Sequence, residues 1–433
     1  MATPNLPIPG PSSLAAVERA GAVECPAFGH RRTARPGADP EDAAPIVLAR
    51  GSGSEIVDVD GNRYLDFTAG FGSVLLGHGH PALSRAIRAQ ADTLVQGLGD
   101  VYSSDVKIAL MEALAALHPS GHGQVLLTQS GSDAVAAAMK TATLATGRHG
   151  FVAFDGAYHG LGFGPLAACG FRASFREPFA PQLNAHVRFC PYPGVRGASA
   201  DAALGMVRES LRAEPIAAIL VEPVMGRGGC VTPPAGFLRE LQRLAHEAGA
   251  LLIADEVWTG LGRAGAWLRS HDDGASADIV CLGKGLGGGL PISACVASRE
   301  AMAGWTRGET IHTSTHAGAP LGCAAALAVL RTLREEHLVE RARETGLRAQ
   351  ELLRPLLAHP SVLDVRGSAM MLGIELDSAR TALAATRRLL RRGFLVVTGG
   401  IDGATLTLTP PLTMAASDFA DFAEALRESL EDA

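Results

Sequence analysis

The chain has 433 residues, of which 47% are hydrophobic and 19% are charged, and its formal net charge is −6. A chain this long and apolar can bury a large core, which excludes wholesale disorder and predicts two or three domains. The acidic balance, without a basic block, excludes nucleic acid and an anionic membrane surface as expected partners. No apolar run is long enough for a membrane span and no secretory signal opens the chain. The seven cysteines form no CxxC pair, so we expect reduced thiols and a cytoplasmic location.

The N-terminal part of the chain has two predicted features. The first forty or so residues contain many prolines and glycines, and this composition predicts an extended arm rather than a packed element. Residues 55–59 and 63–67 then flank an Asp-Gly-Asn sequence at 60–62. Because Asp-Gly between two short β-rich runs is typical of a tight turn, we expect a β-hairpin here.

From residue 124 onward, short apolar runs alternate with helix-like stretches. The runs are residues 124–128, 151–154, 186–190, 217–221, 250–254, 279–282 and 292–297, and helices are expected over 133–146, 202–213 and 235–248. Near-continuous apolar strands separated by helices indicate an α/β fold with a mostly parallel, seven-stranded sheet covered on both faces. After residue 323, one long helix to about Leu353, three strand-like runs and a terminal helix from Ala416 predict a smaller α+β unit.

Three segments partly match motifs of other protein classes, but the residues around each segment do not fit that class. Residues 283–288 spell G-x-G-x-x-G, but Pro291 and a β-like run follow where a dinucleotide site needs a helix. Gly285 follows the lysine of this segment, where a P-loop needs Ser or Thr. His312 and His316 are four residues apart, but the Thr-Ser-Thr sequence between them is poor helix. We therefore expect loop histidines and no metal site.

Three further features each have a functional interpretation and a purely structural one. Asp255 ends a buried run, at the position where open α/β sheets bind ligands, but it can also be a helix cap. Lys284 lies among glycines after another strand, where a desolvated lysine can form a Schiff base; the alternative is a surface lysine in a flexible loop. Ser130, Gly131 and Ser132 open a predicted helix whose N–H groups can bind phosphate, or which the serines simply cap.

One cofactor accounts for all three features together. Pyridoxal phosphate needs a lysine for its aldehyde, a carboxylate that keeps its ring nitrogen protonated, and a phosphate site. Additional motifs make the chain, from about residue 53 to residue 412, resemble the class III (ω-) aminotransferases among the fold type I pyridoxal phosphate enzymes. These motifs are DFTAGFG at 66–72, LGHGHP at 76–81, SGSDA at 130–134, YHG at 158–160, EPV at 222–224 with GG at 228–229, DEV at 255–257 with TGLGR at 259–263, and THAGAPL at 315–321.

The resemblance implies pyridoxal 5'-phosphate as cofactor, small-molecule amine and carbonyl substrates, and a homodimer whose active sites both chains complete. It implies that Lys284 forms the Schiff base and moves the substrate's proton, and that Asp255 binds the ring nitrogen. The cofactor-binding candidates are Ser130, Gly131, Ser132, Tyr158, His159, Glu222, Asp255, Val257, Trp258, Lys284 and Thr315. Among these, Tyr158 and Val257 are expected on the two ring faces, and Thr315 is expected to reach the phosphate in the neighbouring subunit.

The resemblance also implies three parts of the chain. Residues 1–75 would form an N-terminal arm and hairpin that joins the small domain. Residues 76–325 would form the large cofactor-binding domain, and residues 326–433 the C-terminal small domain.

The chain departs from the family in the region that recognises the substrate. Thr407 stands where many members have an arginine, in the run R-x-x-P-P-L, that binds an α-carboxylate. Arg227 stands where several members have a glutamate that pairs with that arginine. Trp258 replaces a glutamine that bonds the cofactor's phenolic oxygen, and its indole N–H can donate instead. The alternatives without a functional role are that Arg227 faces solvent and that Trp258 only packs. Phe71 is a third candidate, with Arg227 and Thr407, for substrate contact.

These observations predict an aminotransferase that moves an amino group between an amino donor and an aldehyde or ketone. Without the arginine at position 407, we expect the reacting carbon to be terminal or otherwise not next to a carboxylate, with any acidic group farther out near Arg227. The alternatives are an aminomutase or racemase of the same fold, and a non-catalytic dimer that uses the fold for binding.

Overall fold

The computed structural model describes residues 7–33, 45–307 and 309–431. Its largest sheet has seven strands in the order β4-β10-β9-β8-β7-β5-β6. β10 is antiparallel to both of its neighbours, and the other pairs in the sheet are parallel. The predicted mostly parallel, seven-stranded sheet is therefore confirmed. The strands are β4 (Gln124–Thr128), β5 (Gly150–Phe154), β6 (Val187–Cys190), β7 (Ile216–Val221), β8 (Leu251–Asp255), β9 (Ile279–Leu282) and β10 (Ser293–Ala297).

Helices cover this sheet on both faces, as the unbroken apolar strands predict. In β5, Phe151 and Ala153 join the core beneath one layer of helices, whereas Val152 and Phe154 join the core on the opposite face. Successive residues of a strand point to opposite faces, so every position of such a strand must be apolar. One layer contains α6 (Gly131–Thr146) and α12 (Arg299–Met302), and the other contains α9 (Ala200–Ala213) and α10 (Phe237–Glu247).

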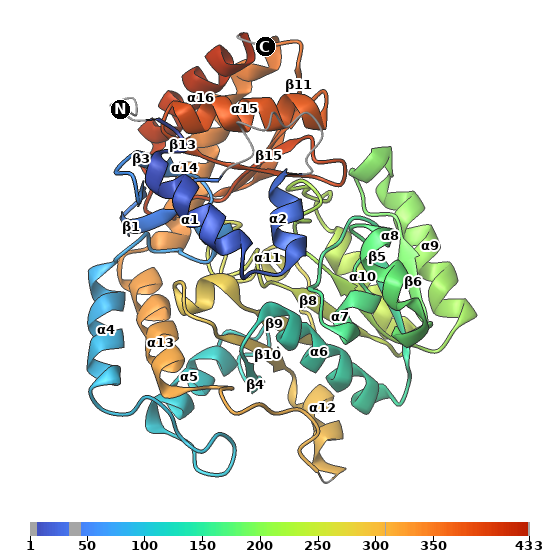
Figure 1. Ribbon diagram of the computed structural model, residues 1–433. Coiled ribbons are helices and arrows are strands. Elements are labelled where there is room, and N and C mark those ends of the chain that lie inside the picture. The colour runs from blue at the N-terminus through green and yellow to red at the C-terminus, as the bar shows by residue number, and fades with distance from the viewer. Residues whose placement is uncertain (1–6, 34–44, 308, 432–433) are drawn as a thin grey trace.

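A smaller antiparallel sheet, in the order β11-β12-β15-β14, lies beside the large one at the top of Figure 1. Helices α15 (Ala379–Arg391) and α16 (Ala416–Glu431) belong to the same unit. The predicted smaller α+β unit and its terminal helix from Ala416 are thus confirmed. Its strands are β11 (Val362–Ser368), β12 (Met371–Leu376), β14 (Val397–Gly399) and β15 (Thr405–Leu408).

A third sheet links the N-terminal hairpin to the C-terminal unit. The predicted hairpin is confirmed as β2 (Glu55–Asp58) and β3 (Arg63–Asp66), and β1 (Leu48–Ser52) pairs with β2. On the other side, β13 (Phe394–Leu395) pairs parallel with β3. The N-terminal and C-terminal ends of the chain consequently meet in one sheet. The bounds 1–75, 76–325 and 326–433 stay a prediction.

The predicted extended arm is wrong for the residues that the structure describes. Residues 11–21 form α1 (Pro11–Gly21), and residues 26–33 form α2 (Pro26–Thr33). Each helix begins with proline, which suits the first helical position because its missing N–H needs no partner there. Asp60 of the hairpin accepts hydrogen bonds from the N–H groups of Ser12 and Ser13, at 2.7 and 2.9 Å, and so satisfies the first turn of α1. Residues 1–6 and 34–40 of the expected arm lie outside the described residues.

The single long helix predicted from residue 323 is also wrong, because the structure has two helices. They are α13 (Pro320–Glu335) and α14 (Leu338–Leu353), and His337 separates them with a φ of 51°. A non-glycine residue in this left-handed conformation ends a right-handed helix. The remaining helices are α3 (Ala69–Gly72), α4 (Pro81–Ala91), α5 (Asp105–Ala115), α7 (Phe163–Ala167), α8 (Ala173–Arg176) and α11 (Arg269–Asp272).

Two expectations about the whole chain can be compared with the structure. Within residues 7–33, 45–307 and 309–431, no helix combines the length and the apolar composition that a membrane crossing requires. The seven cysteines are all free thiols, as expected from their spacing. The cytoplasmic location stays a prediction.

Candidate active site

The site residues predicted from separate motifs converge at one edge of the large sheet. Strands β4, β5, β7, β8 and β9 run in the same direction, so their carboxyl ends lie at the same edge. This edge is where open α/β sheets bind ligands. Residues from the segments that directly follow these strands, in chain order, are Ser130, Gly131 and Ser132; Tyr158 and His159; Glu222; Asp255 at the end of its strand, with Val257 and Trp258; and Lys284.

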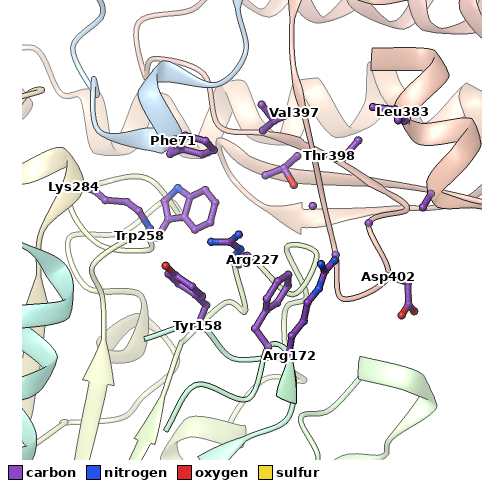
Figure 2. Close-up of a pocket in the computed structure, with 16 residues that line it drawn as sticks. Phe71, Tyr158, Arg172, Arg227, Trp258, Lys284, Leu383, Val397, Thr398 and Asp402 are labelled. Atoms are coloured by element: carbon purple, nitrogen blue, oxygen red, sulfur yellow. The ribbon is translucent and has the colours of Figure 1, made fainter. Parts of the chain in front are cut away.

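A cavity of about 710 Å³ opens between this edge and the small antiparallel sheet. Figure 2 shows Lys284, Trp258 and Tyr158 on one side and Val397 and Thr398 of β14 across from them. This volume is typical of a small-molecule site. The cavity is lined by residues of both sheets, which are far apart in the sequence. The placement of the two sheets relative to each other therefore determines the shape of the cavity.

Asp255 is 5% exposed and makes two contacts within the site. Its Oδ2 lies 2.7 Å from Nδ1 of His159, and its Oδ1 accepts a hydrogen bond from the N–H of Val257 at 3.1 Å. The second contact caps the turn that follows β8, and the helix cap predicted as the alternative is not formed, because the next helix, α11, begins only at Arg269. A carboxylate can accept about four hydrogen bonds, so Asp255 can also accept one from a protonated ring nitrogen. Nε2 of His159 is buried and has no hydrogen-bond partner among the described residues.

Glu222 connects two segments of the cavity wall. Its carboxylate accepts hydrogen bonds from the N–H of Tyr158 at 2.8 Å and from that of Gly226 at 3.0 Å. Burial raises the pKa of Glu222, while the nearby His159 lowers it. These partners are backbone groups beside Tyr158 and Arg227, so Glu222 positions both side chains. Its predicted contact with the cofactor stays a prediction.

Lys284 is one of only three lysines in the sequence. The ammonium groups of Lys107 and Lys140 donate to the carbonyl oxygens of Gly99 and Ile311, outside the cavity, whereas Lys284 lines it. Nζ of Lys284 lies 3.9 Å from the ring centroid of Trp258. Desolvation lowers the pKa of Lys284 to about 8, although the neighbouring carboxylates raise it. A large share of this amine is therefore neutral and nucleophilic at mildly alkaline pH.

The helix α6 opens with a turn in which both predicted serines already have partners. Oγ of Ser130 accepts from the N–H of Asp133 at 3.2 Å, and Oγ of Ser132 accepts from that of Gly162 at 3.0 Å. The capping interpretation therefore holds for the Ser130 hydroxyl. The phosphate site at the first-turn N–H groups stays a prediction. A Cβ at Gly131 would lie 2.6 Å from Cγ1 of Val257, so this turn and Val257 approach as closely as glycine allows.

Trp258 occupies a slot between two glycines. A Cβ on Gly72 would lie 2.4 Å from its Nε1, and a Cβ on Gly226 would lie 2.5 Å from its Cε3. The indole Nε1 is buried and has no hydrogen-bond partner within the described part of the chain. A buried donor without an acceptor costs about 1–3 kcal/mol. The unpaired indole N–H therefore indicates that a bound molecule supplies the acceptor. This feature fits a cofactor attached at the adjacent Lys284.

Arg227 lies inside the cavity and not on the outer surface (Figure 2). Its guanidinium carbon is 4.5 Å from the ring centroid of Tyr158 and 4.9 Å from that of Phe171. Its backbone carbonyl accepts a hydrogen bond from the N–H of Gly400, at 3.0 Å, in the small unit. Packing against aromatic faces holds the planar guanidinium in a fixed orientation. The position of Arg227 thus differs from that of a solvent-facing loop arginine, which was the alternative without a functional role.

The other three predicted residues have different surroundings. Thr407 lines the cavity from β15 and is 3% exposed, and Phe71 lines it while 55% exposed. Thr315 is exposed and does not line the cavity of its own chain. Its carbonyl oxygen accepts a hydrogen bond from Nε2 of Gln96 at 2.6 Å. The expected contact of Thr315 with a phosphate in the other subunit stays a prediction.

Sequence reasoning missed the residues at the mouth of the cavity. Phe171 contacts both Arg227 and a second arginine, because the guanidinium carbon of Arg172 lies 5.1 Å from the same ring. Arg172 also donates to the carbonyl oxygen of Ile401, at 3.2 Å, and so bridges to the small unit. None of these residues belongs to a recognisable motif, and the small unit reaches them only in the folded chain. No sequence signal identifies them.

Comparison with known proteins gives consistent results. Residues 37–430 match the family described as aminotransferase class-III. An acetylornithine aminotransferase from Mycobacterium tuberculosis is 40% identical over 392 residues, which cover 90% of this chain and 92% of that protein. An acetylornithine aminotransferase from Methanosarcina acetivorans is 36% identical over 370 residues, which cover 86% of this chain and 88% of that protein.

Solved structures resemble the whole fold. An amine transaminase from an uncultivated Pseudomonas species, in its PLP-bound form, has a TM-score of 0.83 and 31% identity, covering 91% of this chain and 95% of that one. The ornithine aminotransferase from Toxoplasma gondii ME49 has a TM-score of 0.82 and 27% identity, covering 96% and 97%. The cavity lysine and the buried carboxylate of Asp255 are groups that such a cofactor requires, and the unsatisfied indole N–H of Trp258 is compatible with it.

Proposed function

Because the chain belongs to the class III aminotransferases and is a pyridoxal 5'-phosphate-dependent transaminase, we propose that it transfers an amino group at a carbon not adjacent to a carboxylate. Arg227 binds the substrate's carboxylate at a distance from the reacting carbon. The observation that carries this proposal is the guanidinium of Arg227 inside the cavity, stacked on Tyr158 and Phe171.

The proposed roles of the surrounding residues follow from their positions. Bound pyridoxal phosphate supplies an electron sink for the reacting carbon. Lys284 would hold the cofactor through its amine, and the same amine, when free, would move the proton at the reacting carbon. The Asp255 carboxylate keeps the ring nitrogen protonated, and His159 orients that carboxylate through the 2.7 Å contact. Tyr158 and Val257 pack on the ring, and the first turn of α6, at Ser130, Gly131 and Ser132, holds the phosphate.

The cavity favours a distal carboxylate over an adjacent one for two reasons. The position facing β14 carries the neutral Thr407, which cannot form the two charged hydrogen bonds that a carboxylate makes with a guanidinium. Of the two guanidinium groups that line the cavity, those of Arg172 and Arg227, only that of Arg227 stacks on Tyr158, the residue expected on the cofactor ring.

The same proposal includes a homodimer. A cluster of exposed apolar side chains lies between α4 and α5, at Leu94, Val95, Leu98, Val101 and Tyr102. Exposed apolar clusters of this kind mark interaction surfaces. Gln96 of this segment binds the carbonyl of Thr315, so the cluster adjoins the residue expected to serve the other subunit's site. We expect Leu98→Glu to weaken a dimer measured by light scattering, whereas Leu363→Glu, at an exposed leucine on β11, leaves it intact.

The substrate class is tested with matched donors. We compare kcat/KM for an ω-amino acid and for the alkyl amine of the same length, in the wild type, in Arg227→Ala and in Arg172→Ala. A charged hydrogen-bonded pair contributes about 1.5–3 kcal/mol, so the carboxylate should give roughly a 10- to 150-fold advantage in the wild type. Arg227→Ala should remove that advantage, and Arg172→Ala, whose guanidinium already donates to the carbonyl of Ile401, should retain most of it.

The result that would refute the role of Arg227 is an equal advantage in Arg227→Ala, or none in the wild type. The same assay, run with donor alone, separates the reaction types. A transaminase releases one equivalent of carbonyl product per site and then stops until an acceptor is added. An aminomutase or racemase continues to convert the donor.

A further inference from the structure

We infer that the substrate carries a hydroxyl group that forms a hydrogen bond with Thr407 inside the cavity. The inference rests on the proposed function and narrows its substrate class. Thr407 is 3% exposed, and its Oγ1 is buried without a hydrogen-bond partner in the ranges that the structure describes. Buried hydroxyl groups almost always have a partner, and leaving one without a partner is costly.

The strand around Thr407 fixes this buried hydroxyl at the cavity wall. Thr407 lies opposite Gly373 of β12 and Val397 of β14 in the sheet, so sheet pairing and not the side chain fixes its backbone. A Cβ at Gly399 would lie 2.3 Å from Oγ1 of Thr407, and Val397, Gly399 and Thr407 all line the cavity. A side chain at position 399 would therefore collide with the hydroxyl and displace it. The glycine lets the Thr407 hydroxyl keep its position at the cavity wall.

The partner of this hydroxyl is neutral and belongs to the substrate. Val397, Gly399 and Gly373 around Thr407 carry no charge, and burying an anion without a cation beside it is strongly unfavourable. An anion finds cations elsewhere in the cavity, at the guanidinium groups of Arg227 and Arg172. The cofactor has a closer donor in Trp258, whose indole lies beside Lys284, whereas Thr407 stands on the small sheet. A threonine hydroxyl can donate and accept, as a substrate hydroxyl can, so the two can pair in either direction.

The experiment uses ω-amino acids of four to six carbons, each with and without a hydroxyl on an interior carbon. We measure kcat/KM with the holoenzyme for the wild type, Thr407→Val and Thr407→Ser. We expect at least one hydroxylated donor to exceed its parent by about tenfold in the wild type, from one hydrogen bond in a buried site. Thr407→Ser should preserve that advantage, because it keeps the hydroxyl, and Thr407→Val should abolish it.

Two further measurements separate recognition from structural support. Thr398→Val removes a partly exposed hydroxyl from the same cavity wall and should leave the preference unchanged. Thr407→Val should raise the melting temperature of the holoenzyme, because it removes a buried hydroxyl without a partner. A hydroxyl that supported the fold would give the opposite shift.

The inference is overturned if no hydroxylated donor exceeds its parent at any chain length, or if the advantage persists in Thr407→Val. It is also overturned if Thr407→Val lowers the melting temperature. Failure here leaves the proposed function intact, since the unhydroxylated donors still report transamination and its dependence on Arg227. Failure of the proposed function would appear instead as equal rates for donors with and without the distal carboxylate.

Discussion

Replacing Asp255 with asparagine removes one negative charge from the site and leaves its shape nearly unchanged. The side-chain oxygen of asparagine can still accept the hydrogen bond from the N–H of Val257, which Asp255 accepts at 3.1 Å. The amide cannot provide the charge that faces His159 at 2.7 Å, nor can it keep a ring nitrogen protonated. The substitution therefore separates the electrostatic function of Asp255 from its function as a cap.

The expected loss is large because the carboxylate is 5% exposed. Water screens such a buried charge weakly, and removing one preorganised electrostatic group costs ~3–5 kcal/mol of transition-state stabilisation, by analogy with other sites. Since each 1.36 kcal/mol changes a rate about tenfold, kcat should fall by roughly 10² to 10⁴. The Asp255 charge also raises the pKa of Lys284, so Asp255→Asn should lower that pKa further below about 8.

The assay measures kcat from carbonyl product, together with the cofactor content and the melting temperature of the purified protein. Asp273→Asn is the matched control, because Asp273 also accepts two backbone hydrogen bonds, from Gly236 and Leu238 at 3.1 Å each, but lies outside the cavity. The control should keep its kcat within about twofold, as expected for a change distant from the reacting atoms. Turnover of Asp255→Asn near the wild-type rate would refute the reasoning and leave Asp255 as a cap.

Two other predictions concern the neighbours of this carboxylate. In protein freed of cofactor, the rate at which the cofactor reattaches covalently should rise with pH and level off above about pH 9. A pKa near 8 leaves about a tenth of Lys284 neutral at pH 7 and about nine tenths at pH 9. A reattachment rate that falls with rising pH would contradict this prediction. Glu222→Gln should raise KM more than it lowers kcat and should lower the melting temperature. The reason is that glutamine cannot accept hydrogen bonds from the N–H groups of both Tyr158 and Gly226, as Glu222 does. An unchanged KM would show that Glu222 does not position Tyr158 and Arg227.

The large sheet and its cofactor edge could be predicted from the sequence because their signals are local. Apolar runs bounded by helices identify the strands, and the residues that end them, such as Asp255 and Lys284, must then share one edge. The errors have equally local causes. The prolines that suggested an extended arm instead begin α1 and α2, and the break at His337 comes from a backbone conformation that its residue type does not announce.

The substrate side of the cavity could be predicted only in part. Thr407 and Arg227 were identified because they depart from a family motif, but Phe171 and Arg172 come from a segment without one. Their contribution depends on how the small sheet docks against the large one, through contacts such as that between Arg172 and the carbonyl of Ile401. Contacts between residues more than two hundred positions apart leave no periodic pattern in the sequence.

The most direct test of the central claim is to reduce the holoenzyme with borohydride and to map the modified peptide. The sequence contains three lysines, Lys107, Lys140 and Lys284, so the measurement has few possible outcomes. The account predicts a pyridoxyl group on Lys284 alone, and none on Lys284→Ala, which should still fold. A pyridoxyl group on Lys107 or Lys140, in protein that turns over normally, would contradict it.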